Sequence, residues 1–349
     1  MTDVRSVAAR DTQSWRPLVA RYQRPRTSRA MLQLGTTLLP LALVFGGMYR
    51  LLALSFWWTL VLALPAAGLL VRTFVLMHDC AHGSFFPSRR ANRVVGAITG
   101  LLTLIPFEHW RHEHGLHHAS AGDLDRRGHG DVDTLTLREY FARTRWGRLR
   151  YRIIRHPLVY LAVGPVFFVL EKRLPPRGPG AGRRQIMSVW ANNAAIVIVG
   201  LGLASVLGAR VFLIYFPAYY VAVAAGLWLF FVQHQFEGTY WQDHQNWDYG
   251  AAAIAGSSFF RLPALLQWVT GSIGFHHVHH LGPRIPNYNL QQCHEENPLF
   301  QRATVVTLRQ SLSALRLALW DEEGGRLVSF ARARDLEWAR LRPASILST

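Results

Sequence analysis

The apolar residues of this 349-residue chain gather into long runs separated by polar, arginine-rich stretches. An α-helix needs about 20 apolar residues to cross the hydrocarbon core of a bilayer. Four runs approach or exceed that length and predict membrane-spanning helices: residues 32–49, 53–77, 186–207 and 211–232. Short links join the first two runs and the last two, so the pattern predicts two helical hairpins. The fold expected is an all-α integral membrane protein with four transmembrane helices, interfacial helices and a cytoplasmic cap.

Two further apolar runs are too short to cross a bilayer unaided. Residues 94–106 are predicted to be re-entrant or interfacial, and residues 157–170 to form an interfacial or partly buried helix. The only charge within the second long run, Arg72, lies near the end of that run. Its long side chain is therefore expected to extend to the membrane surface.

The positions of the basic residues predict the orientation of the helices. The net charge of +17 comes almost entirely from arginine, because Lys172 is the only lysine. Arginines crowd both ends of the chain and the 126–184 region, whereas the two outer turns hold only Arg50 and Arg210. Basic residues favour the cytoplasmic side of a membrane, so both termini are expected there. A basic chain can also bind nucleic acid, but the long apolar runs favour a membrane and argue against a nucleic-acid partner.

This layout predicts three regions. A basic cytoplasmic N-terminal segment (1–31), ordered at most in part, precedes a membrane domain with a cytoplasmic cap (32–300), and a basic cytoplasmic tail (301–349) follows. The two cysteines, Cys80 and Cys293, are too few for a disulfide framework and are expected to stay reduced.

The spacing of the histidines supplies the candidate chemistry. Positions i, i+3 and i+4 share one face of a helix, and neutral imidazole is the commonest nitrogen ligand of transition metals. Three clusters have this spacing: His78 and His82; His114, His117 and His118; His276, His279 and His280. All three are expected at the cytoplasmic surface of the membrane. Eight ligands exceed the about four to six that one ion accepts, so two metals are predicted. Imidazole ligands alone leave zinc, iron and copper open.

The other histidines are judged by their positions. His234 lies where the fourth predicted span meets the cytoplasm and is a candidate ninth ligand. His277 points away from the face shared by its neighbours, so it is expected behind the ligands or on the surface. Six further histidines are expected to be bystanders: His109, His112, His129, His156, His244 and His294. For His109 and His112 a role in supporting a ligand from behind also remains open. Three carboxylates lie close to the clusters in sequence or at the same depth: Asp79, Glu113 and Glu237. Each either orients a ligating imidazole through its second nitrogen or is simply solvated, and both alternatives remain open. Cys80 is expected to pack rather than to bind metal.

The three clusters read HDCAH, HGLHH and HHVHH around two membrane hairpins, and they resemble the histidine boxes of membrane fatty acid desaturases. The similarity extends to the stretches RTFVLMHDCAHGSFF, FVQHQFEGTYW, WDYGAAAIAGSSFFRLPALLQW and GFHHVHHLGPRIPNYNLQQCH and covers roughly residues 40–300. These stretches are most similar to bacterial acyl-lipid desaturases of the omega-6 or Δ12 type. The N-terminal segment and the tail carry no motif of the family.

The resemblance implies a site with two non-haem iron ions that uses O2 and external electrons to leave a cis double bond in an acyl chain. It implies a location in the bacterial inner membrane with the active site on the cytoplasmic side. The iron ligands that it implies are His78, His82, His114, His117, His118, His276, His279 and His280, and His234 matches an extra histidine after the fourth span. An unactivated methylene has no acidic proton, which agrees with a metal that carries the difficult chemistry.

The electrons are expected to come from another protein, since the chain has neither a dinucleotide-binding fingerprint nor an iron–sulfur cysteine pattern. The arginine-rich surface is a candidate docking site for an acidic carrier such as a ferredoxin. The equal alternative is that these arginines only set the topology and contact anionic lipid.

Two other functions remain open at this stage. A di-iron hydroxylase or ketolase of alkanes, sphingolipids or carotenoids would share the histidine boxes. A metal or haem transporter would place histidines within the spans, and the predicted clusters lie at span ends instead. The sequence leaves open the position of the double bond, the chain length, and whether the acyl chain is carried by a lipid, coenzyme A or a carrier protein.

Overall fold

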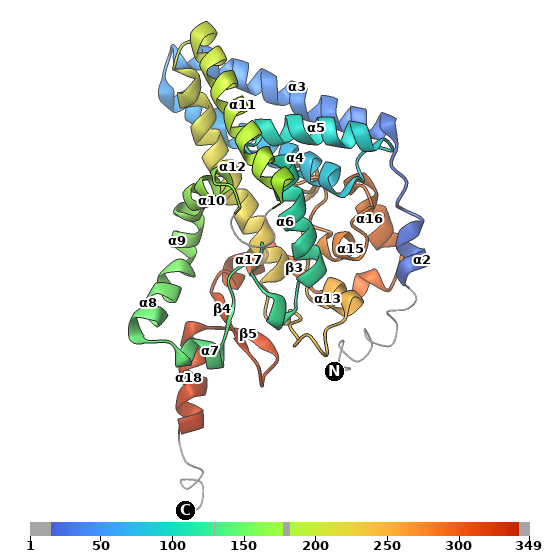
Figure 1. The fold of residues 1–349 in the computed structure, drawn as a ribbon, viewed down its shortest axis with the longest axis vertical. Helices are drawn as coiled ribbons and strands as arrows, with labels where there is room; N and C mark the ends of the chain where they lie inside the picture. The colour runs from blue at the N-terminus through green and yellow to red at the C-terminus, as the bar shows by residue number, and fades with distance from the viewer. Residues whose placement is uncertain (1–14, 129, 177–181, 342–349) are drawn as a thin grey trace, which may run out of the picture.

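The computed structural model describes residues 15–128, 130–176 and 182–341. The described helices that are long and apolar enough to cross a membrane form a bundle that we call the stem (Figure 1). They are α3 (Thr27–Leu52), α4 (Phe56–His82), α11 (Arg183–Leu207) and α12 (Val211–His234). They coincide with the four predicted runs and form two hairpins, so the prediction of an all-α membrane protein is confirmed.

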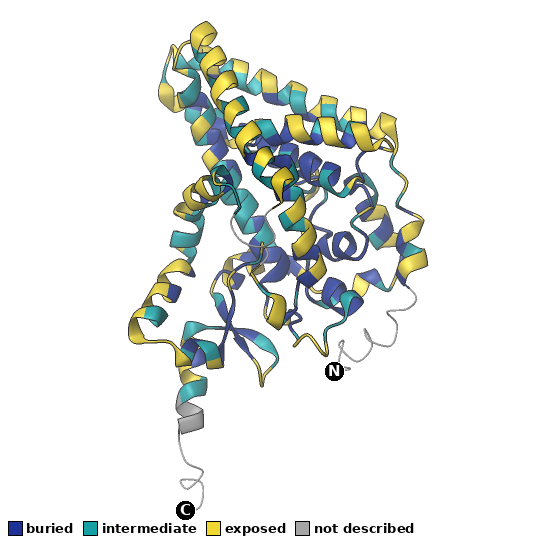
Figure 2. Ribbon diagram, viewed as in Figure 1, coloured by how far each residue is buried: buried dark blue, intermediate teal, exposed yellow. Residues whose placement is uncertain are grey.

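Helix α4 is the centre of the stem. It packs against both α3 and α12. In its most apolar stretch 61% of the residues are buried, whereas the corresponding share in α11 is 6%. The outer faces of the bundle are exposed (Figure 2), and many of the residues exposed there are large and apolar, as a surface in contact with lipid must be. Helices α4 and α12 continue beyond their apolar runs, to His82 and His234. These extensions carry histidines out of the stem and into the cap.

Arg72 does not extend to the membrane surface, so that prediction is wrong. Its side chain is buried, with 3% of the residue exposed. The guanidinium donates from Nε to Oγ1 of Thr37 at 3.0 Å and from Nη1 to the carbonyl of Trp268, and it lies 4.2 Å from the Trp268 ring centroid. Because these groups satisfy the cation inside the protein, it has no need of interfacial water.

The first short apolar run forms most of α5 (Arg89–Leu102) and the turn after it. Val94 and Ile98 are exposed on one side of this helix, and Asn92 and Gly96 are buried on the other. Such a one-sided apolar surface suits a helix that lies in the membrane interface.

The second short apolar run is broken into two helices at Val163. Together with the preceding helix it forms an extension that we call the arm: α8 (Arg145–Ile154), α9 (Pro157–Ala162) and α10 (Gly164–Arg173). In Figure 1 the arm leaves the bundle beside α12, against which α9 and α10 pack.

The cap lies below the stem in Figure 1 and is built mainly from short helices. They are α6 (Phe107–Ser120), α7 (Leu137–Ala142), α13 (Tyr249–Ala255), α14 (Ala264–Val269), α15 (His276–Leu281), α16 (Asn287–Glu296), α17 (Leu308–Ala314) and α18 (Phe330–Leu341). Part of the N-terminal segment also belongs to the cap, because α2 (Trp15–Ala20) buries Trp15 and Val19 in the cluster that contains Val278. Residues 1–14 lie outside the described residues.

Short strands join the last part of the chain to the cap. Strand β1 (Leu135–Thr136) pairs in parallel with β4 (Leu317–Asp321), which pairs antiparallel with β5 (Arg326–Ser329). Strand β2 (Phe259–Arg261) pairs in parallel with β3 (Val305–Thr307). The predicted boundary at residue 300 therefore falls between strands that bond to each other.

Candidate metal centre

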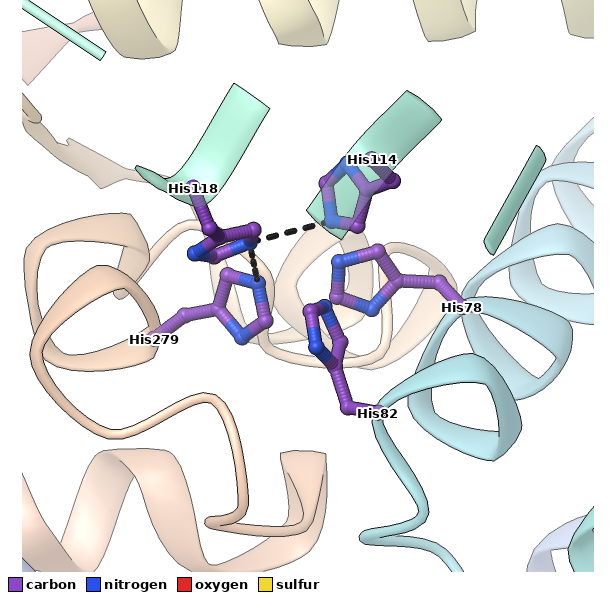
Figure 3. Close-up of side chains that lie close together, drawn as sticks. All are labelled: His78, His82, His114, His118 and His279. Atoms are coloured by element: carbon purple, nitrogen blue, oxygen red, sulfur yellow. Dashed lines mark hydrogen bonds between the residues drawn. The ribbon is translucent and has the colours of Figure 1, made fainter. Parts of the chain in front are cut away.

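The nine histidines predicted as ligands converge into two groups, although they come from four separate helices. The first group, drawn in Figure 3, comes from α4, α6 and α15 and consists of His78, His82, His114, His118 and His279. The second group comes from α6, α12 and α15 and consists of His117, His234, His276 and His280. Within each group the candidate ligand atoms all lie within 4.8 Å of one another.

Helix geometry explains how neighbouring residues reach different groups. Each residue turns the helix by about 100°, so His117 and His118 point to different groups although they are adjacent in α6. Cys80 lies about 200° around α4 from His78 and is buried among apolar residues instead. Both cysteines are free thiols, as predicted.

The facing nitrogens have the separations of ligands around shared ions. Nε2 of His118 lies 3.1 Å from Nε2 of His114 and 3.0 Å from Nε2 of His279. Nε2 of His234 lies 3.2 Å from Nε2 of His117 and 2.9 Å from Nε2 of His276. With metal–nitrogen bonds of about 2.1 Å, ligands at right angles lie about 3.0 Å apart and opposite ligands about 4.2 Å apart. Both groups therefore fit a metal ion.

Burial keeps these imidazoles in the form that binds metal. The pKa values of His114, His118, His276, His279 and His280 are held well below the usual value, first by burial and then by the neighbouring imidazoles. The rings are therefore neutral at pH 7, and each offers a lone pair. Nε2 of His280 has no hydrogen-bond partner among the residues that the structure describes, and an unpaired buried nitrogen is costly unless a metal binds it.

An apolar cavity of about 500 Å³ reaches both groups, because His78 and His114 of the first and His117 and His276 of the second line it. Along α12 its lining runs from Tyr219 to Gln233, a helical length of about 21 Å. The wall is mostly apolar, with side chains from α4, α10 and α12. The cavity can therefore hold an extended hydrocarbon chain next to the metal centre.

The comparisons with known proteins agree with this geometry. The model of the "Fatty acid desaturase" family matches residues 55–310. The chain belongs to the fatty acid desaturase family. It is 41% identical, over 89% of each chain, to a protein of Bacillus subtilis named "Fatty acid desaturase". A tobacco protein named "Omega-3 fatty acid desaturase, endoplasmic reticulum" is 28% identical over 63% of this chain and 59% of its own.

A third relative, from Synechocystis, is named "sn-1 acyl-lipid omega-3 desaturase (ferredoxin)" and is 26% identical over 64% of this chain and 62% of its own. These matches make the chain a desaturase enzyme and a membrane protein.

In this desaturase a second layer of acceptors orients three of the imidazoles. His117 donates from Nδ1 to Oδ1 of Asp131 at 2.7 Å, and His234 donates from Nδ1 to the carbonyl of Gly256 at 3.1 Å. His78 Nδ1 lies 3.3 Å from Oδ1 of Asp79. Each contact leaves Nε2 free to face the group. The orienting role considered for Asp79 is thus confirmed, whereas sequence reasoning missed Asp131 and Gly256, which lie in connecting segments without a helical period.

The other two carboxylates orient no ligand among the described residues. Glu113 accepts from Nζ of Lys172 at 2.6 Å and lies 3.5 Å from His109. Glu237 is mostly exposed and pairs loosely with Arg326 at 3.8 Å. Of the two roles left open for Glu113 and Glu237, the contacts therefore do not support orientation of a ligand, because Glu113 pairs with Lys172 and Glu237 with Arg326.

The remaining histidines lie outside the two groups. His277 is buried behind the ligands, where its Nε2 lies 3.0 Å from Nδ1 of His294, and burial lowers its pKa to about 3. His294 is thus hydrogen-bonded outside the two groups, which agrees with its prediction as a bystander. His244 is also paired, with Nδ1 2.8 Å from Oδ2 of Asp123. His112 is exposed, His156 precedes α9, and His129 lies outside the described residues.

Proposed function

We propose that this desaturase uses two non-haem iron ions, O2 and external electrons to introduce a cis double bond into a fatty acyl chain. We further propose that this acyl chain is part of a membrane lipid and that the double bond forms at the Δ12 or omega-6 position. The observation that carries the proposal is the pair of imidazole groups beside an apolar cavity. The proposed ligands are His78, His82, His114, His118 and His279 for one ion and His117, His234, His276 and His280 for the other.

The iron, when bound, would supply the oxidising power that an unactivated C–H bond requires. The residues of this chain hold the substrate and exclude water. The apolar wall binds the acyl chain along α12 and presents one stretch of methylenes to His78, His114, His117 and His276. The position of the double bond then depends on how far the chain can enter.

The proposed orientation places both termini and the metal centre on the cytoplasmic side of a bacterial inner membrane. The arginine distribution supports this orientation. Two relatives carry "acyl-lipid" and "ferredoxin" in their names, which supports a lipid substrate and an acidic protein as electron donor. Docking of such a donor on arginines would weaken as salt rises, so turnover that stays constant between low and high salt would refute it.

The test is expression in a host that makes only saturated and monounsaturated chains, followed by fatty-acid profiling. New dienes support the proposal, new monoenes move the double bond elsewhere, and products that gain oxygen favour a hydroxylase or ketolase. The inactive control is His118→Ala, which removes a proposed ligand. The matched control is His112→Ala, since that side chain is exposed on the same helix. Purified, active enzyme without iron would refute the metal assignment.

A further inference from the structure

The arm carries apolar side chains that nothing in the described chain covers. Trp146 of α8 is 79% exposed, and Leu149 and Ile153 on the same helix are exposed as well. Leu158 of α9 and Phe167 of α10 are exposed as well, by 72% and 67%. Exposing this many apolar side chains to water is unfavourable in free energy, whereas contact with lipid acyl chains is favourable.

Helix α8 also carries the charge that suits a lipid surface. Its sequence, RWGRLRYRII, alternates arginines with large apolar residues. Arg145, Arg148 and Arg150 form no ion pair with any residue that the structure describes. Basic residues beside an exposed apolar face are attracted to the anionic head groups of the inner leaflet. The arm is therefore complementary to the bilayer in both shape and charge.

The exposed surface of the arm is continuous with the acyl cavity. Ile154, Gly164 and Phe167 from the arm and Val223 and Leu227 from α12 all line that cavity. Ile154 and Phe167 are also among the exposed apolar residues. An apolar path thus leads from the outer face of the arm, between the arm and α12, to the histidines.

Contacts between the arm and α12 close this path. A Cβ on Gly164 would lie 3.3 Å from Cδ1 of Leu227, so the two helices come close here. The hydroxyl of Tyr160 donates to the carbonyl of Leu227 at 3.3 Å, and that of Tyr220 donates to the carbonyl of Ala162 at 2.6 Å. The helix break at Val163 lies at this point, where a small backbone change would move α9 relative to α10.

We propose that the gap between the arm and α12, bounded by Gly164 and Leu227, is a lateral port through which an acyl chain enters from the bilayer. The substrate class is then the acyl chain of a bilayer phospholipid, whose head group stays at the interface beside the arginines of α8. This inference rests on the proposed function, in which the acyl chain belongs to a membrane lipid, and adds the route by which that acyl chain reaches the histidines.

The test locks the port reversibly. The double variant Gly164→Cys, Leu227→Cys is treated with a short bifunctional thiosulfonate, which links the two thiols without requiring disulfide geometry. Both native cysteines are buried, and the controls are the same double variant before the reagent and the wild type with the reagent. We expect at least a tenfold loss of turnover on phospholipid vesicles, unchanged iron content, and recovery when a reductant releases the link.

The outcomes separate this inference from the proposed function. If the wild type makes no unsaturated product, the proposed function fails first. If the wild type is active and the linked enzyme keeps its rate on vesicles, the port is refuted. A second measurement compares phospholipid vesicles with a soluble acyl-coenzyme A as substrates of the wild type. Turnover of the soluble thioester alone would also refute the port, because such a substrate has no need to enter from lipid.

Discussion

Removing the charge of Asp131 tests whether the second group binds metal. The carboxylate is the acceptor for Nδ1 of His117 at 2.7 Å, and the two side chains are only 9% and 2% exposed. Asp131→Asn keeps the size and one acceptor oxygen but loses the charge that fixes the proton on Nδ1. The wrong tautomer would then point an N–H at the ion, and the ring would be a weaker ligand.

Loss of such an outer partner typically costs about 10- to 100-fold in metal affinity or activity, equivalent to about 1.4–2.7 kcal/mol. The short, buried contact of Asp131 places it toward the upper part of that range. Asp79→Asn should cost less, because Asp79 lies 3.3 Å from His78 and its second oxygen also accepts from the backbone N–H of Asn287 at 2.7 Å.

The assay is iron per chain by elemental analysis after dialysis against increasing chelator, together with turnover. For Asp131→Asn we expect the iron content to fall from two toward one at chelator concentrations that leave the wild type intact. The control is Asp133→Asn, an exposed carboxylate two residues further on, which should behave as wild type. If Asp131→Asn retained both irons and full turnover, the assignment of the second group as a metal site would be refuted.

Three further predictions concern His234, Arg72 and His277. His234→Ala should reduce the iron content to about one per chain and abolish activity, whereas His294→Ala should retain both ions, and elemental analysis distinguishes the two. Arg72→Leu leaves the carbonyl of Trp268 without its donor and should cost about 1–3 kcal/mol, seen as a lower melting temperature in detergent, whereas the exposed Arg50→Ala should stay within about 0.5 kcal/mol. His277 is buried neutral with a pKa of about 3, so the unfolded state binds the extra proton below about pH 6.5. The protonation of His277 alone should then lower the free energy of unfolding by about 1.4 kcal/mol per pH unit as pH drops from 6.5 toward 3, so His277→Gln should show a shallower slope than the wild type in thermal unfolding.

Local spacing was sufficient to find the nine histidines that the structure brings together in two groups. The intervals between His78 and His82, and within each H-x-x-H-H triplet, are properties of one helix turn, so they can be read without any tertiary contact. The membrane spans are equally local, because the bilayer thickness alone sets the length of an apolar run. Arg72 shows the limit of this reasoning. Its position in the run suggested the surface, but its partners Thr37 and Trp268 lie on helices distant in sequence.

The sequence by itself determined the four spans and the three histidine clusters, because each depends on residues within a few turns of one another. The three clusters together then indicated the family. Only the tertiary structure decided how the nine imidazoles divide, with adjacent His117 and His118 directed to different groups. It also decided that Asp131, and not Glu113, supports a ligand ring. The physical reason is that these contacts depend on how α4, α6, α12 and α15 pack, and that packing joins segments up to about 200 residues apart, from His78 to His279.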